Sequence, residues 1–180
     1  MKSCTRLALF TVVPLLILSC AKTPTTVVTP PPSNVYSPNA ITAHVKASPQ
    51  LNLYDGTSHA LHLCIYQLSD PNVFNQLSDT DAGISKLMRC EKFDAGVAMS
   101  HKYVFMPSEE KTVDLDRAEG ARYVGIAAGY YSLQKQNSIR LYSIPMVEEK
   151  RENMIVYKYD RLVMSLFLGP QELKGLGEKQ

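Results

Sequence analysis

The sequence predicts an all-β domain, a two-sheet β-sandwich of seven or eight strands with one short helical insertion. Three observations support this fold class. Short segments of alternating apolar and polar residues recur along the chain, and turn-forming residues separate them at short intervals. The ten Tyr, together with Val, Ile and Thr, favour strands. Residues 72–88 depart from this pattern and have the periodicity of helices.

Residues 1–19 have the features of a secretory signal peptide. A basic start with Lys2 and Arg6 precedes an apolar stretch over residues 7–18, which is shorter than the roughly 20 residues that span a bilayer. Cys20 follows Leu18 and Ser19, an arrangement that resembles the bacterial lipobox. In that pattern the cysteine receives acyl chains, which anchor a soluble domain to a membrane. The alternative is an ordinary signal cleaved near Ser19, with Cys20 incidental.

Residues 20–39 are expected to form a lipidated cysteine followed by an extended linker. The segment is rich in Thr and Pro, with three consecutive prolines at 30–32, and it offers little to bury. Fully extended, it would hold a domain about 50 Å from the bilayer. Residue 21 is Ala rather than the Asp of the inner-membrane retention signal, which favours the outer membrane.

The first two strands are predicted at residues 41–47 and 61–68. The first alternates apolar and polar residues and is therefore half-buried, whereas the second is apolar on both faces, as a central strand would be. The connection between them contains Asp55-Gly56, which indicates a tight turn. It also contains Leu51, Leu53 and Tyr54, which are apolar residues in a segment expected to be exposed.

Residues 72–88 are predicted to form two short helices, with Ser69 or Asp70 capping the first and Thr80 or Asp81 the second. Cys64 and Cys90 bracket this insertion. An even pair of cysteines in an oxidising compartment favours a disulfide, which would clamp the helices to the sheet; two buried thiols are the alternative.

Further strands are predicted at residues 101–106, 111–115, 121–132 and 139–144, and a hairpin at 154–159 and 162–168. In the segment 121–132 one face carries small residues, which allow another layer to approach closely. The charged run 148–152 is expected to be a solvated loop. The sandwich domain would therefore cover residues 40–170, and residues 171–180 would form a flexible tail.

The sequence lacks the usual signatures of catalysis. It has no Gly-x-Ser-x-Gly, no His-Glu-x-x-His and no phosphate-binding glycine loop, so we expect neither an enzyme nor a cofactor or small-molecule substrate. His59 and His62 are three residues apart but lack a third ligand nearby, so no metal is expected. The net charge of +2 does not suggest a nucleic-acid partner. A tethered binding module fits these features best.

Two places could bind another protein. The connection at 51–60 is one, unless Leu51 and Leu53 fold back under the edge of the sandwich. The tyrosine pairs 130/131 and 157/159 are another, unless they pack on the sheet.

Several segments together resemble the TssJ family, the outer-membrane lipoproteins of type VI secretion. The resemblance covers most of residues 41–131, and the segments that carry it, with Cys20, are Leu51-Asn52, Asp55-Gly56, Ile65-Tyr66-Gln67-Leu68, Phe74, Leu77 and the strand at 123–128. It implies a transthyretin-like sandwich and a role in binding the periplasmic C-terminal region of the inner-membrane protein TssM. It further implies that the loop joining the first two strands makes the contact, here through Leu51, Asn52, Leu53, Tyr54 and Asp55.

Other functions fit the anchor and the fold as well. A pilotin-like or other assembly lipoprotein for a different envelope machine is the main alternative. A periplasmic hydrolase or glycan-binding accessory would need a pocket with convergent titratable groups. A surface lipoprotein without a fixed partner is a third possibility.

Overall fold

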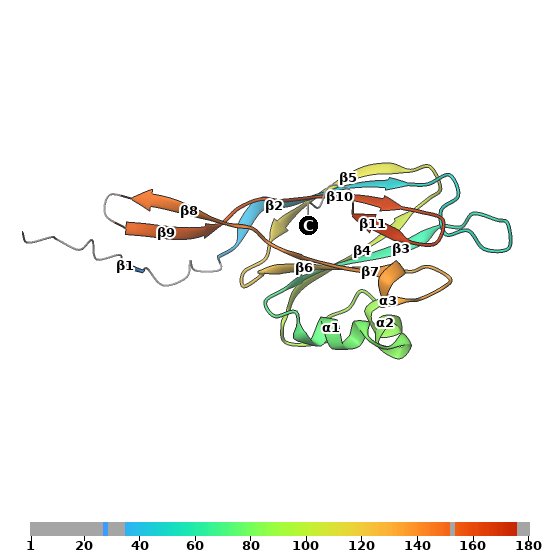
Figure 1. The fold of residues 1–180 in the computed structure, drawn as a ribbon, viewed down its shortest axis with the longest axis horizontal. Helices are drawn as coiled ribbons and strands as arrows, with labels where there is room; N and C mark the ends of the chain where they lie inside the picture. The colour runs from blue at the N-terminus through green and yellow to red at the C-terminus, as the bar shows by residue number, and fades with distance from the viewer. Residues whose placement is uncertain (1–26, 29–34, 152–153, 176–180) are drawn as a thin grey trace, which may run out of the picture.

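The computed structural model describes residues 27–28, 35–151 and 154–175 of the chain. Within these ranges two four-stranded sheets lie face to face, in the orders β11-β10-β2-β5 and β4-β3-β6-β7, and β1-β9-β8 form a third, smaller sheet. Figure 1 shows the sandwich, with α1 and α2 covering the outer face of the second sheet and the β8–β9 hairpin projecting from one end. The predicted two-sheet sandwich with a helical insertion is confirmed. The predicted signal peptide, Cys20 and most of the linker lie outside the described residues.

The first sheet is built on β2 (Ser37–Ala47), which pairs with both of its neighbours along most of its length. β10 (Leu162–Leu168) runs parallel to β2, with Leu162 opposite Ile41, and β5 (Glu110–Arg117) runs antiparallel on the other side. The predicted alternation in β2 is confirmed, and β10 has the same pattern: the apolar residues of each strand are buried and face the second sheet. The buried stripes are Ile41, Ala43, Val45 and Ala47 in β2, and Leu162, Met164, Leu166 and Leu168 in β10.

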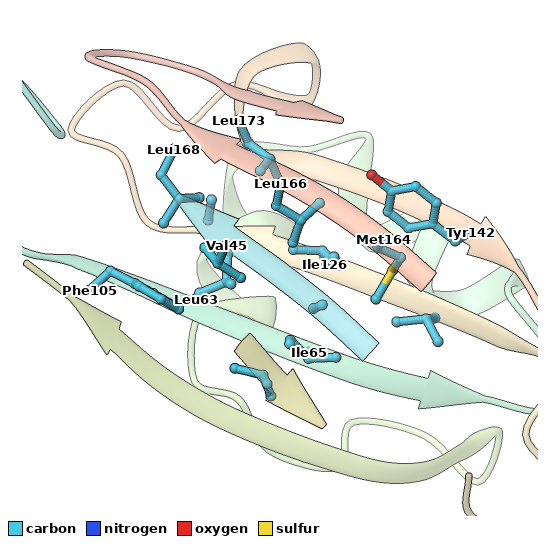
Figure 2. Packing of buried hydrophobic residues seen from close by; sticks show 14 of the residues in the cluster. Val45, Leu63, Ile65, Phe105, Ile126, Tyr142, Met164, Leu166, Leu168 and Leu173 are labelled. Carbon is cyan, nitrogen blue, oxygen red and sulfur yellow. The ribbon is translucent and has the colours of Figure 1, made fainter. Parts of the chain in front are cut away.

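The second sheet is built on β3 (Leu61–Leu68), which lies between β4 (Val97–Phe105) and β6 (Tyr123–Ala128), with β7 (Ile139–Ser143) at the edge. β3 is central, as its two apolar faces predict. Leu63 and Ile65 pack between the sheets, whereas Cys64 and Tyr66 pack under the helices. Figure 2 shows Val45 and Leu166 of the first sheet pointing into the same interior as Leu63 and Ile126 of the second.

The helical insertion consists of α1 (Asn72–Ser78) and α2 (Asp81–Leu87). Thr80 caps α2 through its side chain, which accepts a hydrogen bond from the N–H of Gly83. Cys64 and Cys90 form the predicted disulfide, with 5.1 Å between their Cα atoms. The small residues of β6 face these helices, as predicted. A Cβ on Gly125 would lie 2.8 Å from the Phe74 ring, so only glycine permits this spacing. A short helix, α3 (Lys135–Ser138), precedes β7.

The predicted hairpin around Asp160-Arg161 is wrong. β9 (Met154–Tyr159) pairs with β8 (Met146–Arg151), and the chain then continues past Asp160 into β10, which joins a different sheet. In its parallel position beside β2, the whole apolar stripe of β10 is buried in the core between the two four-stranded sheets. The run 148–152, expected to be a loop, is largely strand β8. It is supported across the pair by an ion pair between Lys158 and Glu149 at 3.1 Å.

The expectation of a mobile tail is wrong for residues 171–175. β11 (Leu173–Gly175) pairs with β10, and the Leu173 side chain is fully buried in the core between the sheets. One buried apolar residue is enough to hold this polar segment against the sandwich, because β11 also pairs with the edge of β10 that β2 leaves open. β1 (Val27–Val28), within the expected linker, pairs in parallel with β9.

Candidate functional site

The loop 48–60 joins β2 to β3 and lies at the end of the sandwich opposite the β8–β9 hairpin (Figure 1). Main-chain hydrogen bonds attach it to the segment after β10: the N–H of Leu53 donates to the carbonyl of Pro170 at 2.7 Å, and that of Asn52 to Gly169 at 3.4 Å. Across the loop itself, the N–H of His59 donates to the carbonyl of Leu51 at 3.0 Å. The loop is thus held at its base on both sides.

The outer end of the loop 48–60 is a tight turn, as the Asp55-Gly56 pair predicts. Tyr54 and Thr57 exchange two main-chain hydrogen bonds of 2.9 Å, and the two residues between them have φ angles of 48° and 71°. Two consecutive positive φ angles are typical of the turn that Asp-Gly favours in hairpins. The turn directs Tyr54 outward from the body of the sandwich, where the residue is 56% exposed.

Asn52 joins the loop to the segment that follows β6. Its side-chain oxygen accepts a hydrogen bond from the N–H of Tyr131 at 3.0 Å, and its side-chain nitrogen donates to the carbonyl of Ala60 at 3.3 Å. Asn52 is 5% exposed and has a φ of 45°, a conformation that Asn adopts more readily than most residues. Its role here is to hold two loops together.

Two tyrosine rings lie stacked on the surface above this connection. The ring centroids of Tyr54 and Tyr131 are 4.3 Å apart with 19° between the planes, and the His59 ring meets Tyr131 edge-on at 5.0 Å. Both tyrosines remain half-exposed. Exposed aromatic rings that are already ordered are well suited to protein contacts, since little side-chain entropy remains to be lost on binding.

The structure therefore divides the five residues singled out in the loop. Leu51 is fully buried in the core, so the alternative in which it folds back under the sandwich is confirmed. Asn52 is buried as well, Leu53 is half-buried, and Tyr54 and Asp55 are exposed.

Sequence reasoning did not connect Tyr131 with this loop. The structure separates Tyr130 from Tyr131, the pair that could have formed one aromatic surface: Tyr130 is in the core, where burial raises the pKa of its hydroxyl, and Tyr131 is on the surface. The alternation of β6 indicates this separation. No sequence signal indicates that residues 130–132 and 170–171 meet the loop, because these contacts join distant segments.

A shallow depression lies between the three segments. Its volume is about 200 Å³, below the 300–1,000 Å³ typical of sites for small-molecule ligands. It has room for one side chain of a partner protein. It is lined by residues that include Leu53, Tyr54, Tyr131, Ser132, Pro170 and Gln171.

Within the described ranges, no three Asp, Glu, His or Cys side chains are placed to hold a metal ion. None of the helices described is both long and apolar enough to cross a bilayer.

A model of the Type VI secretion lipoprotein family (T6SS-SciN; VasD, EvfM, TssJ) matches residues 39–163, which is more than half of the chain. The chain belongs to this family. The match covers the loop 48–60, the segment 130–132 and the whole of the second sheet, and it ends at the start of β10 in the first. Membership in the TssJ family favours type VI secretion over the pilotin-like alternative. No curated protein sequence matched the chain.

Three solved structures show the same fold at low sequence identity. TssJ1 from Pseudomonas aeruginosa has a TM-score of 0.59 at 18% identity, covering 79% of this chain and 98% of its own. Lip from Serratia marcescens, a membrane-bound component of the type VI secretion system, has a TM-score of 0.56 at 16% identity, covering 77% and 97%. A chain of the T6SS protein TssM C-terminal domain (869-1107) structure from EAEC has a TM-score of 0.57 at 16% identity, covering 77% and 98%.

Proposed function

We propose that this protein is held at the periplasmic face of the outer membrane by a lipidated Cys20 and docks the C-terminal periplasmic region of TssM. Family membership supports a place in the type VI secretion envelope complex. A chain with the same fold occurs in a structure of the TssM C-terminal domain from EAEC, which supports TssM as the partner. The role is one of assembly rather than catalysis.

The observation that carries the proposal is the stacking of Tyr54, on a loop that is hydrogen-bonded at its base, against Tyr131 of the segment after β6. Interfaces are enriched in aromatic residues, and a few such residues commonly dominate the binding energy. Here the two rings come from different segments and are joined through Asn52, so the surface is formed before a partner arrives.

The position of the loop suits a partner that is anchored in the opposite membrane. The described chain enters β2 at Ser37, next to the β8–β9 hairpin, and reaches the loop after the 11 residues of the strand. A strand of this length spans about 35 Å. The loop is therefore at the end of the domain remote from the linker and the proposed anchor. With both proteins confined to the envelope, a modest affinity suffices, because tethering raises their effective concentration.

The docking surface is tested with point variants, because replacing the whole of residues 51–55 would also remove the buried Leu51. Tyr54→Ala and Tyr131→Ala should each weaken binding to the purified TssM C-terminal region by about tenfold or more. Val163→Ala is the matched control, since Val163 is also 56% exposed but lies on the first sheet away from the loop. All three variants should unfold close to the wild-type midpoint. Wild-type affinity in both tyrosine variants would exclude this surface.

The anchor is tested separately in cells. Cys20→Ser should move the full chain from the membrane fraction to the soluble periplasm, because the acyl chains supply the attachment. Ala21→Asp should retain the lipid but shift the protein to the inner membrane, which separates lipidation from sorting. Retention of the Cys20→Ser variant in membranes would contradict the proposed anchor.

A further inference from the structure

The end of the sandwich that carries the loop is poor in positive charge. Three segments meet the loop 48–60 there: residues 106–109, 129–134 and 169–172, joined to it by hydrogen bonds. We call these four segments the tip. The tip contains no Lys or Arg, although the chain has 19 of them. Its ionisable acids are Asp55, Glu109 and Glu172.

Of these three carboxylates, Asp55 is the one that no ion pair or hydrogen bond found between the described residues engages. Glu172 forms an ion pair with Lys174 at 2.7 Å, and Glu109 accepts a hydrogen bond from the N–H of Met106 at 2.8 Å. Asp55 is exposed, directly follows Tyr54, and takes part in none of the ion pairs found between the described residues. The carboxylate that directly follows Tyr54 in the chain therefore forms no ion pair with any cation among the described residues.

The stacked rings themselves favour a cation. The faces of tyrosine rings carry partial negative charge and attract Lys or Arg side chains that lie within about 6 Å of the ring centre. Tyr54 and Tyr131 are both half-exposed and both line the depression of about 200 Å³. Its lining is mixed, with the polar groups of Asn52, Ser132 and Gln171 beside Leu53 and Pro170. Such a lining suits a side chain with an apolar stem and a polar, charged end.

We propose that the segment of TssM that docks on the tip presents an arginine, which enters this depression, lies against the Tyr54–Tyr131 rings and is balanced by Asp55. Arginine fits better than lysine because its guanidinium is planar, stacks on aromatic faces and is less strongly hydrated. This inference rests on the proposed function, which names the loop as the docking surface, and it specifies the chemistry that the partner must bring.

The test compares variants that preserve or remove each proposed contact, in binding to the same TssM region. Tyr54→Phe and Tyr131→Phe keep the ring faces and should bind within about twofold of wild type. Tyr54→Leu and Tyr131→Leu keep apolar area but lose the ring, and should bind about 5-fold to 30-fold more weakly. Unfolding midpoints, measured alongside, should stay close to wild type for these exposed positions.

The contribution of the charge is tested with Asp55→Asn. This variant should weaken binding severalfold at low salt and reduce the loss of affinity that added NaCl causes in the wild type, because salt screens charge pairs at the surface. Glu119→Gln is the matched control: it makes the same change in charge at an exposed site beyond β5, at the linker end of the domain, and should leave affinity unchanged.

On the partner side, replacing the arginines of the TssM region one at a time should identify a single position. Its change to Met should make binding insensitive to Asp55→Asn.

The outcomes separate the two proposals. If the Leu variants bind as well as the Phe variants and salt has no effect, while the Ala variants are weakened, the tip docks TssM through an apolar group and the arginine proposal is overturned. If the Ala variants also bind normally, TssM docks elsewhere and the proposed docking surface is overturned; if the wild-type protein does not bind the TssM region at all, the proposed function itself is overturned. Weakening by Leu but not Phe, together with the Asp55 salt effect, supports the arginine.

Discussion

The side-chain oxygen of Asn52 accepts a hydrogen bond from the main-chain N–H of Tyr131 at 3.0 Å. These residues are 79 positions apart in the chain. Through this contact a buried amide places two surface tyrosines in one stack. Folding stability and partner binding are therefore linked at Asn52, while the tyrosines can be changed without affecting the core.

We expect Asn52→Ala to destabilise the fold by about 2–4 kcal/mol. It leaves the Tyr131 N–H without its acceptor and places Ala at a φ of 45°, which Asn tolerates better. Asn52→Gly removes the same side chain but tolerates the φ angle, so it should cost less. Urea unfolding of both variants measures the difference. Equal stability of Asn52→Ala and wild type would show that the contact contributes nothing to the fold.

Gly125→Ala should destabilise the protein by about 1–3 kcal/mol, because the added methyl would lie 2.8 Å from the Phe74 ring. The strain should be partly relieved in the double variant Gly125→Ala/Phe74→Leu. Measured by denaturant unfolding, the cost of Gly125→Ala should therefore be smaller in the Phe74→Leu background than in wild type. If the two changes are additive, the helix and the sheet do not meet as closely as described.

Reduction of the Cys64–Cys90 disulfide should lower the free energy of unfolding by about 3 kcal/mol, as expected for a crosslink that spans 26 residues. Scanning calorimetry with and without a reductant measures the effect. The double variant Cys64→Ala/Cys90→Ala should melt at the lower temperature and should not respond to the reductant. Binding to TssM at a temperature where both forms are folded should be unchanged, since the disulfide is under the helices rather than at the tip.

Stability should fall at alkaline pH through Tyr66. Burial raises the pKa of Tyr66 from 10.0 to about 12, and its hydroxyl donates to the carbonyl of Leu87. Because the pKa is higher in the folded state, this contribution is fully present below pH 10 and is lost as the pH rises towards 12. The loss amounts to about 3 kcal/mol.

Tyr66→Phe should be less stable near pH 8, through the lost hydrogen bond, but should show a shallower decline above pH 10. Urea unfolding from pH 8 to 11.5 provides the comparison. Some decline should remain, because burial raises the pKa of Tyr130 as well. An identical slope in wild type and variant would assign the alkaline sensitivity to other groups.

Local patterns predicted the strands and helices well. The bounds of β3, β9 and β10 agree with the predicted segments, and the small face of β6 does receive the helices. Alternation and period report which side of an element is apolar, and burial follows from that. Alternation does not indicate the sheet to which a strand belongs. The predicted hairpin between β9 and β10 is wrong for that reason.

In the candidate site, the turn at Asp55-Gly56 followed from its two residues alone, because few others adopt consecutive positive φ angles. The exposure of each loop residue did not follow. Leu51 and Leu53 are the same residue type two positions apart, yet the first is fully buried and the second half-buried. Their environments depend on Gly169 and Pro170, which arrive from the far end of the chain.

The sequence by itself determined that this protein is a β-sandwich with a helical insertion bracketed by two cysteines, and which residues are apolar enough to fill its core. These are properties of residue type and spacing along a few turns or strands. Only the tertiary structure decided that β10 lies parallel to β2, that Leu173 covers the edge of the sheet, and that Tyr131 stacks on Tyr54. Each depends on segments distant in sequence that meet only in the folded chain, where the gain from burying shared surface exceeds the entropy lost in bringing them together.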